Sequence, residues 1–308
     1  MFALMFPGQG SQSLGMLQDW AQQSSIVTET FSQASSQLNY DLWALVQTGP
    51  DEKLNQTQYT QAAILTASIA LYRIFTQGFS AKPSYLVGHS LGEYTALVCA
   101  GVLEFETAVK LVELRGRLMQ EAVPLGVGAM AAIVGLKAEE VEALCKTVST
   151  LTEYVTPANY NADTQVVVAG HSLAVERLIL IAAERGAKIA KKLPMSVPSH
   201  CFLMKSAAEK LAKHLDTLSF NIPQIPVIHN VDVSEHQSSL EIKESLIKQL
   251  YFPVRWTEIM NKLAHFQIKK VIECGPGKVL TGLSKRITPS PSEAISISSP
   301  AAFQDLSL

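Results

Sequence analysis

The chain has 308 residues, 47% of them hydrophobic and 17% charged, and its 25 lysines and arginines against 27 acidic residues leave a net charge of −2. This length predicts two domains or one large fold with an insertion, and either holds a sizeable core. The balanced charge excludes a polybasic nucleic-acid binder, and the apolar content excludes a disordered acidic chain.

Short apolar runs alternate with helical patterns in the first 124 residues. Runs that glycine or proline cuts off predict buried strands, and apolar residues spaced by three or four predict helices. The strands are expected at 2–6 and 84–87, and the helices near 16–20 and at 61–75, 93–100 and 105–122. This alternation favours an α/β sandwich with a mainly parallel sheet.

The pattern changes between about 125 and 195, where the sequence predicts a small α/β subdomain. Its strands are expected at 128–134 and 165–169, and its helices at 138–148 and 173–185. We therefore predict a large catalytic subdomain from residues 1–124 and 197–308 and a small one from residues 125–196.

The larger pattern resumes after this insertion. Strands are expected at 227–230 and 270–274, and helices at 201–218, 242–250, 256–264 and from 278 onward. The tail from Pro289 is rich in serine, proline and alanine, which predicts a loop or a loosely held end.

The cysteines and the N-terminal residues indicate the compartment. Cys99, Cys145, Cys201 and Cys274 lie far apart without metal-ligand spacing, which predicts buried thiols in a reducing compartment and no metal site. The apolar run at the N-terminus has no positive residues before it and stops at Pro7, and no window reaches the ~18 apolar residues of a spanning helix. We expect a soluble, cytoplasmic protein without membrane contact.

The segment Gly88-His-Ser90-Leu-Gly92 is the first candidate for chemistry. A G-x-S-x-G motif that follows an apolar strand and opens a helix is typical of a nucleophile elbow, in which a tight turn exposes the serine hydroxyl. The alternative is an ordinary glycine-rich turn. The strand before the motif and the helix after it favour a catalytic serine.

A serine nucleophile needs a base, and seven histidines compete for that role. His89 is adjacent to the serine and is expected to point away from its hydroxyl. Three others lie among polar helix or loop residues, namely His214, His236 and His265. His200, in a proline-stiffened segment, and His229 are close rivals from the pattern alone, and a structural role is open for either.

Arg115 is a charge in the middle of an apolar helix stripe. The stripe consists of Ala108, Leu111, Val112, Leu118, Met119 and Ala122. Arg117 has Glu113 one turn earlier, but none of the helical neighbours of Arg115 can pair with a guanidinium. Its partner is therefore a distant carboxylate of the chain or the carboxylate or phosphate of a ligand, unless the side chain extends to water.

Two glycine-rich loops follow predicted strands. In the segment 7–12, Ser13 stands where a dinucleotide-binding motif has its third glycine, so backbone amides or Gln9 are better suited to an oxyanion. The segment 275–278 lacks the serine or threonine of a phosphate-binding loop and predicts a strand-to-helix turn.

Taken together, these motifs closely resemble bacterial malonyl-CoA:acyl carrier protein transacylases of type II fatty acid synthesis. They are GQGSQ (8–12), Gln61, GHSLGEY (88–94), VELRGRLMQEA (112–122), GAMAA (128–132), PSH (198–200) and GPGKVLTGL (275–283). The resemblance runs in order from Phe2 to about Arg286 and says nothing of the tail after Ile287. It implies a hydrolase-like α/β core with an inserted ferredoxin-like subdomain.

The resemblance also implies roles for individual residues. Ser90 takes the malonyl group as an ester, and His200 acts as general base and then as general acid. The backbone N–H groups of Gln9 and Leu91 form the oxyanion hole. The backbone carbonyl of Gln249 orients the histidine in place of an acid.

The resemblance assigns Arg115 to the malonyl carboxylate and places Gln61, Met119 and Asn159 in the pocket. It implies two-step transfer from malonyl-CoA to acyl carrier protein without a metal or redox cofactor. Independently of the resemblance, we expect a monomer that binds no nucleic acid. The carrier protein is expected to meet a basic surface near the pocket mouth. The candidates are Lys188, Lys191, Lys192, Lys278, Lys285 and Arg286, each of which is otherwise part of a solvated face.

Two other functions compete with this one. A serine hydrolase or thioesterase shares the G-x-S-x-G elbow, but an esterase for neutral acyl chains has no use for Arg115. A scaffold that only docks carrier protein is disfavoured, because a nucleophile, a base and the arginine are all present.

Overall fold

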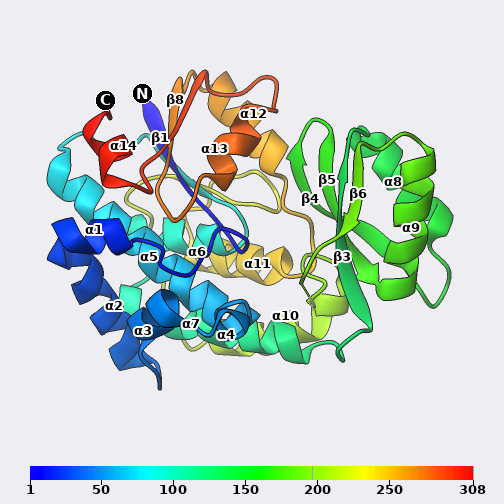
Figure 1. Cartoon of the computed structure of the whole chain (residues 1–308), viewed down its shortest axis with the longest axis horizontal. Coiled ribbons are helices and arrows are strands. Elements are labelled where there is room, and N and C mark those ends of the chain that lie inside the picture. The colour runs from blue at the N-terminus through cyan, green and yellow to red at the C-terminus, as the bar shows by residue number, and fades with distance from the viewer. Residues whose placement is uncertain (196, 308) are drawn as a thin grey trace.

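The computed structural model describes residues 1–195 and 197–307, which form two β-sheets with helices packed around them (Figure 1). The larger sheet has the strand order β7-β2-β1-β8-β9, and all of its strands run parallel. The smaller sheet has the order β4-β5-β3-β6 and is antiparallel. The predicted α/β fold, with a mainly parallel core and a small second sheet, is confirmed.

The larger sheet carries most of the helices. Its strands are β1 (Phe2–Phe6), β2 (Tyr85–Gly88), β7 (Val227–Ile228), β8 (Lys270–Glu273) and β9 (Glu293–Ser296). The helices before the smaller sheet are α1 (Gln18–Gln23), α2 (Ser25–Gln37), α3 (Leu42–Thr48), α4 (Asp51–Leu54), α5 (Thr57–Gly78), α6 (Leu91–Cys99) and α7 (Phe105–Glu121). Those after it are η1 (Phe202–Met204), α10 (Lys205–Leu215), α11 (Ser239–Gln249), α12 (Trp256–His265), α13 (Val279–Ser284) and α14 (Pro300–Gln304).

Strand β1 runs through the middle of the larger sheet and is buried at every residue. Successive side chains of a strand point to opposite faces. Leu4 and Phe6 accordingly join the core that includes α5 and α6, whereas Ala3 and Met5 join the core beneath α12. Because both faces are covered, the strand reads as one continuous apolar run, as parallel strands do.

The smaller sheet follows the ferredoxin-like order of elements, β-α-β-β-α-β. They are β3 (Gly128–Val134), α8 (Ala138–Val148), β4 (Val155–Ala162), β5 (Gln165–His171), α9 (Ser172–Glu184) and β6 (Ile189–Lys192). Two of its strands were not predicted, because β4 contains a proline and two asparagines and β6 is short and exposed. The subdomain boundaries stay a prediction, and residue 196 lies outside the described residues.

Strand β4 connects the smaller sheet to the part of the chain that surrounds the larger sheet. The backbone N–H of Tyr160 donates to the carbonyl oxygen of Val254 at 2.9 Å, and the Thr257 hydroxyl donates to the carbonyl of Tyr160 at 3.0 Å. The smaller sheet is therefore held against the segment that leads into α12. Asn159 of β4 lies at this contact, where it forms a bridge with Val254.

The prediction of a loosely held tail from Pro289 is wrong. Strand β9 pairs in parallel with β8, and the Phe303 ring of α14 packs 5.3 Å from the Trp20 ring and 5.2 Å from the Phe79 ring. The apolar side chains that make these contacts are few and are spread among serines and prolines, so no period was visible in the sequence. The helices between 25 and 54 also went unpredicted.

None of the helices in residues 1–195 and 197–307 combines the length and the hydropathy that a membrane span requires.

Candidate active site

Ser90 lies in the tight turn between β2 and α6, at the carboxyl end of a strand in the middle of the larger sheet. Its φ of 52° is unusual for a residue with a side chain and marks a strained backbone. Two glycines make the turn possible: a Cβ on Gly92 would lie 2.0 Å from the Phe6 carbonyl oxygen, and one on Gly88 would lie 2.0 Å from Gly92. The backbone N–H of Ser90 donates to the side-chain oxygen of Asn230 at 2.8 Å, which supports the turn.

His200 is the histidine that reaches the serine. Its Nε2 lies 2.8 Å from the Ser90 Oγ, and its Nδ1 lies 2.7 Å from the backbone carbonyl oxygen of Gln249. A carbonyl only accepts, so Nδ1 carries the proton, and the lone pair of Nε2 faces the serine hydroxyl. Burial, together with the nearby Arg115 charge, lowers the pKa of His200 to about 3, so the ring is a neutral base at neutral pH.

The rival histidines lie elsewhere. The Nδ1 of His229 is 2.7 Å from the Glu93 Oε1, and both side chains are fully buried. His89 turns its Nε2 to the Asn161 Oδ1, 2.8 Å away. Of the two histidines that the residue pattern leaves open, His200 is the one that lies against the Ser90 hydroxyl, and the backbone carbonyl of Gln249 orients its ring.

Arg115 is only 1% exposed, which excludes an extended side chain that reaches water. One guanidinium nitrogen donates to the Gln61 Oε1 at 2.8 Å, and another donates to the Gln249 Oε1 at 2.9 Å and lies 3.4 Å from the Ser90 Oγ. No carboxylate within the described residues forms an ion pair with it. Burial lowers the pKa of Arg115, but an arginine stays charged in proteins. Arg115 is therefore a buried cation next to the serine, and its hydrogen-bond acceptors are all neutral groups.

These residues line a cavity of about 440 Å³, whose walls come from the smaller sheet and from the elements around the larger sheet. Its polar floor contains Ser90, His200, Arg115 and Gln61, and Asn159 faces it from β4. Met119 also lines the cavity, and its sulfur accepts from the Gln61 side-chain amide at 3.5 Å. The apolar wall is formed by Met130, Val167, Leu193, Met195, Val279, Leu280 and Leu283. All the site residues expected from the sequence thus border this cavity, except Gln249, which lies directly behind it.

Gln9 and Leu91, the two residues expected to supply backbone N–H groups, both line the cavity that contains the serine. Neither of these N–H groups finds a hydrogen-bond partner among residues 1–195 and 197–307. The loop of Gln9 lies close to the elbow, since a Cβ on Gly8 would fall 2.5 Å from the His89 carbonyl oxygen. Free N–H groups near a nucleophile, one of them at a helix N-terminus, suit a developing oxyanion.

A buried polar cluster behind the cavity was missed in the sequence. It comprises Glu93, Asn230 and the side chain of Gln249, all with 0% exposure. The sequence offered one signal: Glu93 is a charged residue in a helix whose other residues from Leu91 to Leu97 are uncharged. The family resemblance assigns a role only to the backbone carbonyl of Gln249, not to its side chain.

The neutral histidines predict how stability depends on pH. Burial lowers the pKa of His89 and, with Arg115, that of His200 to about 3, whereas an unfolded histidine titrates near ~6.5. Below about pH 6.5 the unfolded chain binds more protons than the folded chain, so the free energy of unfolding falls as the pH falls. His200 contributes on the order of 1 kcal/mol per pH unit to this fall, and His89 acts in the same direction.

Denaturant unfolding between about pH 7 and pH 5 checks this expectation. The variant His200→Gln should show a shallower fall than the wild type, and His265→Gln, which changes an exposed histidine, should follow the wild type. A wild-type free energy of unfolding that does not change over this range would contradict it.

Residues 3–295 match a family described as the acyl transferase domain. The chain is 54% identical to the malonyl CoA-acyl carrier protein transacylase of Haemophilus influenzae, over 98% of this chain and 96% of that protein. It is also 54% identical to the enzyme of that name from Escherichia coli, over 93% and 92% of the two chains.

Solved structures agree with these sequence matches. The malonyl CoA-acyl carrier protein transacylase of Coxiella burnetii superposes with a TM-score of 0.96 at 53% identity, over 98% of this chain and 95% of that one. A malonyl-transacylase solved in complex with its type II PKS acyl-carrier protein gives a TM-score of 0.96 at 51% identity, over 98% and 97%.

Proposed function

The chain belongs to the malonyl CoA-acyl carrier protein transacylases, and from that membership we propose that it transfers the malonyl group of malonyl-CoA to the phosphopantetheine thiol of acyl carrier protein, which supplies fatty acid synthesis. The observation that carries this proposal is Arg115. It is a buried guanidinium 3.4 Å from the Ser90 Oγ without a carboxylate partner in the described chain, so it suits an acyl group that ends in a carboxylate.

In the first half-reaction, the Ser90 Oγ attacks the thioester carbonyl carbon while His200 Nε2 takes the hydroxyl proton. The carbonyl oxygen becomes an oxyanion and accepts hydrogen bonds from the backbone N–H groups of Gln9 and Leu91. The carbon–sulfur bond then breaks, the CoA sulfur receives the proton from His200, and a malonyl ester remains on Ser90.

The second half-reaction reverses these roles. The phosphopantetheine thiol gives its proton to His200, and its sulfur attacks the ester carbonyl. The carbon–oxygen bond breaks, and Ser90 regains its proton from His200 Nε2. Every group in these steps belongs to this chain, to malonyl-CoA or to the carrier protein, so we propose no metal or redox cofactor.

The geometry favours His200 for both steps. Its ring is neutral because burial and the Arg115 charge lower its pKa to about 3. A bound malonyl carboxylate would balance the Arg115 charge, and the pKa of His200 would then rise toward the range in which a general base works well. Substrate binding would therefore make the histidine a better proton acceptor.

Arg115→Ala is expected to cost malonyl transfer on the order of 2 to 5 kcal/mol, the penalty of leaving one member of a buried charge pair alone. Acetyl transfer should fall much less, because an acetyl group has no carboxylate. Initial rates of loading from malonyl-CoA and acetyl-CoA measure both. Arg117→Ala, two residues along the same helix and exposed, is the matched control that should leave both rates unchanged. Equal losses for the two substrates would remove the carboxylate role.

Intact-mass measurement tests the function as a whole. After mixing with malonyl-CoA, the protein should gain one malonyl group, keep it in buffer, and lose it to holo acyl carrier protein. Rapid loss to water would indicate the alternative, a serine hydrolase or thioesterase, and no adduct at all would indicate a carrier-protein scaffold. Acetyl-CoA in a parallel reaction should give less adduct.

The carrier protein would approach the mouth of the cavity. The segment 193–195 after β6 and residues of α13 line the cavity, and exposed basic residues adjoin both elements. They are Lys188, Lys191, Lys192, Lys278, Lys285 and Arg286. We propose that this basic surface receives the carrier protein, whose relatives are acidic.

We further propose that the protein works as a monomer in the cytoplasm. Its reaction is completed by groups of one chain, and all four cysteines are free thiols, as is usual in a reducing compartment.

A further inference from the structure

Glu93 is a fully buried carboxylate one turn after the elbow serine, and it does not line the cavity. It accepts three hydrogen bonds, from the His229 Nδ1 at 2.7 Å, the Asn230 backbone N–H at 3.0 Å and the Gln249 side-chain amide at 2.8 Å. A buried carboxylate is costly unless such donors surround it. The donors come from two separate segments, so Glu93 ties those segments to α6.

The first connection leads to the nucleophile. Asn230, whose backbone N–H is held by Glu93, accepts the Ser90 backbone N–H at 2.8 Å and donates to the Gly88 carbonyl oxygen at 2.7 Å. Its side chain thus spans the strained turn, in which Ser90 has a φ of 52°. Holding Asn230 in place therefore fixes the backbone of the serine.

The second connection leads to the base and to the arginine. The amide nitrogen of Gln249 donates to Glu93 and, at 2.9 Å, to the Ser90 carbonyl oxygen. Its amide oxygen accepts from Arg115 at 2.9 Å, and its backbone carbonyl accepts from the His200 Nδ1 at 2.7 Å. One glutamine, anchored on Glu93, therefore contacts both functional side chains.

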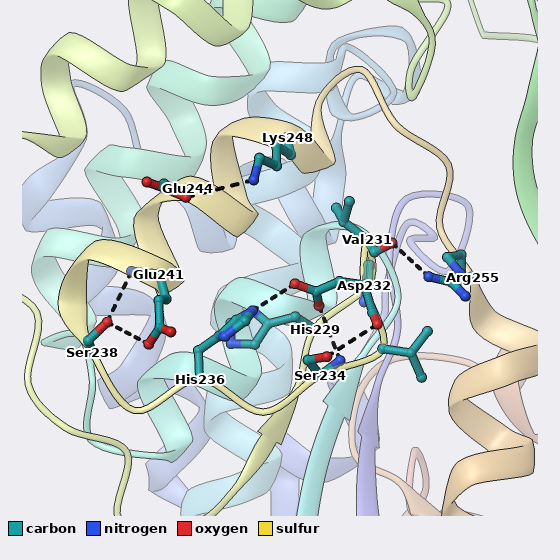
Figure 2. Close-up of polar contacts among 12 residues, drawn as sticks. His229, Val231, Asp232, Ser234, His236, Ser238, Glu241, Glu244, Lys248 and Arg255 are labelled. Atoms are coloured by element: carbon teal, nitrogen blue, oxygen red, sulfur yellow. Dashed lines mark hydrogen bonds and ion pairs between the residues drawn. The ribbon is translucent and has the colours of Figure 1, made fainter.

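The segments that reach Glu93 also carry hydrogen bonds of their own, as Figure 2 shows for the loop after β7. Asp232 accepts from the Ser234 backbone N–H at 3.1 Å and pairs with the His236 ring at 2.8 Å beside His229. The Ser238 side chain accepts from the Glu241 backbone N–H at 3.2 Å and thereby caps α11, the helix that ends at Gln249. Loss of the Glu93 carboxylate would therefore let the loop after β7 and the end of α11 move relative to α6.

We propose that Glu93 is a positioning residue: through Asn230 and Gln249, its carboxylate fixes the relative positions of Ser90, His200 and Arg115. The inference rests on the proposed function. The Gln249 amide also separates the two charges, because its nitrogen faces Glu93 and its oxygen faces Arg115. Glu93 balances the arginine across this amide without forming an ion pair with it, so the guanidinium remains available to a substrate carboxylate.

The test compares Glu93→Ala, Gln249→Ala and the double variant in loading from malonyl-CoA and acetyl-CoA. Gln249→Ala should raise the KM for malonyl-CoA about tenfold and the KM for acetyl-CoA less than about twofold, because among the three functional side chains only Arg115 loses a hydrogen-bond partner. The Ser90 carbonyl also loses the amide donor, but Asn230 still holds the Ser90 backbone N–H. Glu93→Ala should raise the malonyl KM similarly and also lower kcat for both substrates, because the serine and the base lose support. In the double variant, the malonyl KM should rise less than about twofold beyond that of Glu93→Ala, since both substitutions break one connection.

Glu273→Ala is the matched control. Glu273 is also fully buried and also accepts three hydrogen bonds, from the Leu280 and Thr281 backbone N–H groups and the Thr281 hydroxyl, but it contacts none of the three functional residues. This variant should lower the melting temperature about as much as Glu93→Ala while the malonyl-to-acetyl ratio stays at the wild-type value. If Glu93→Ala does not fold, Glu93→Asp, which keeps the charge but shortens the reach, should show the same changes at smaller size.

The inference is overturned if Glu93→Ala lowers only the melting temperature, or if its effect on the malonyl KM adds fully to that of Gln249→Ala. Failure of the proposed function is recognised separately, because the wild type would then take up no malonyl group. Labelling of Ser90 by a fluorophosphonate probe serves in that case. It should be slower in Glu93→Ala than in Glu273→Ala, and equal labelling rates would refute the role of Glu93.

Discussion

Ser90→Ala is expected to abolish covalent malonyl loading, because the Oγ that forms the ester is gone and, in residues 1–195 and 197–307, no other hydroxyl is hydrogen-bonded to His200 Nε2. Transfer to acyl carrier protein should fall by at least about 10⁴-fold, in line with the loss of a nucleophile from a coupled serine–histidine pair. Intact mass after incubation with malonyl-CoA measures the first effect, and the rate of carrier-protein loading measures the second.

The same variant should still bind malonyl-CoA. Arg115 keeps its contacts to Gln61 and Gln249 when the serine hydroxyl is removed, so the site for the carboxylate stays formed. Calorimetric titration should therefore give a dissociation constant within a few-fold of that for an unreactive malonyl-CoA analogue on the wild type. A malonyl adduct on Ser90→Ala would show that another residue is the nucleophile.

His200→Ala should slow acylation at neutral pH by about 10³ to 10⁴-fold, the upper part of the range for removal of a general base. The hydroxyl of Ser90 then has no proton acceptor within the part of the chain that the structure describes, since its other close partner, Arg115, only donates. Stopped-flow measurement of CoA release from malonyl-CoA checks this value.

His229→Ala is the comparison for that experiment. It removes one donor to Glu93 and leaves the Ser90–His200 contact intact, so acylation should slow far less than in His200→Ala. The reverse order of effects would overturn the assignment of the base. Circular dichroism of both variants confirms that the fold is retained.

Much of this site was predictable because its chemistry lies in local sequence. A strand, a G-x-S-x-G turn and a helix identify the surroundings of Ser90, and a single charge on an apolar stripe identifies Arg115. Both signals need only neighbours within one element. The alternation of strand and helix likewise predicted the α/β class, because buried parallel strands read as continuous apolar runs.

What remained open depends on contacts between distant segments. The residue pattern alone does not separate His200 from His229, and only the family resemblance favours His200. The carbonyl of Gln249 and the carboxylate of Glu93 that distinguish the two histidines lie far away in the chain. The anion for Arg115 was equally open until burial excluded water and the described chain offered it no carboxylate. Strand β9 was missed because a four-residue edge strand carries too short a pattern to recognise.

Strand β8, which lies between β1 and the edge strand β9, brings the first and last described parts of the chain together. Lys270 pairs with Phe2 in the sheet, and its ammonium donates to the carbonyl oxygen of Ser307 (Figure 1). A short peptide linker joining these ends would therefore disturb no strand, and the chain could be reopened at Leu151, which is fully exposed between α8 and β4. The fold is thus suited to circular permutation. The new chain ends would lie beside the smaller sheet, and the segment from Ser90 to the end of α7 would stay continuous.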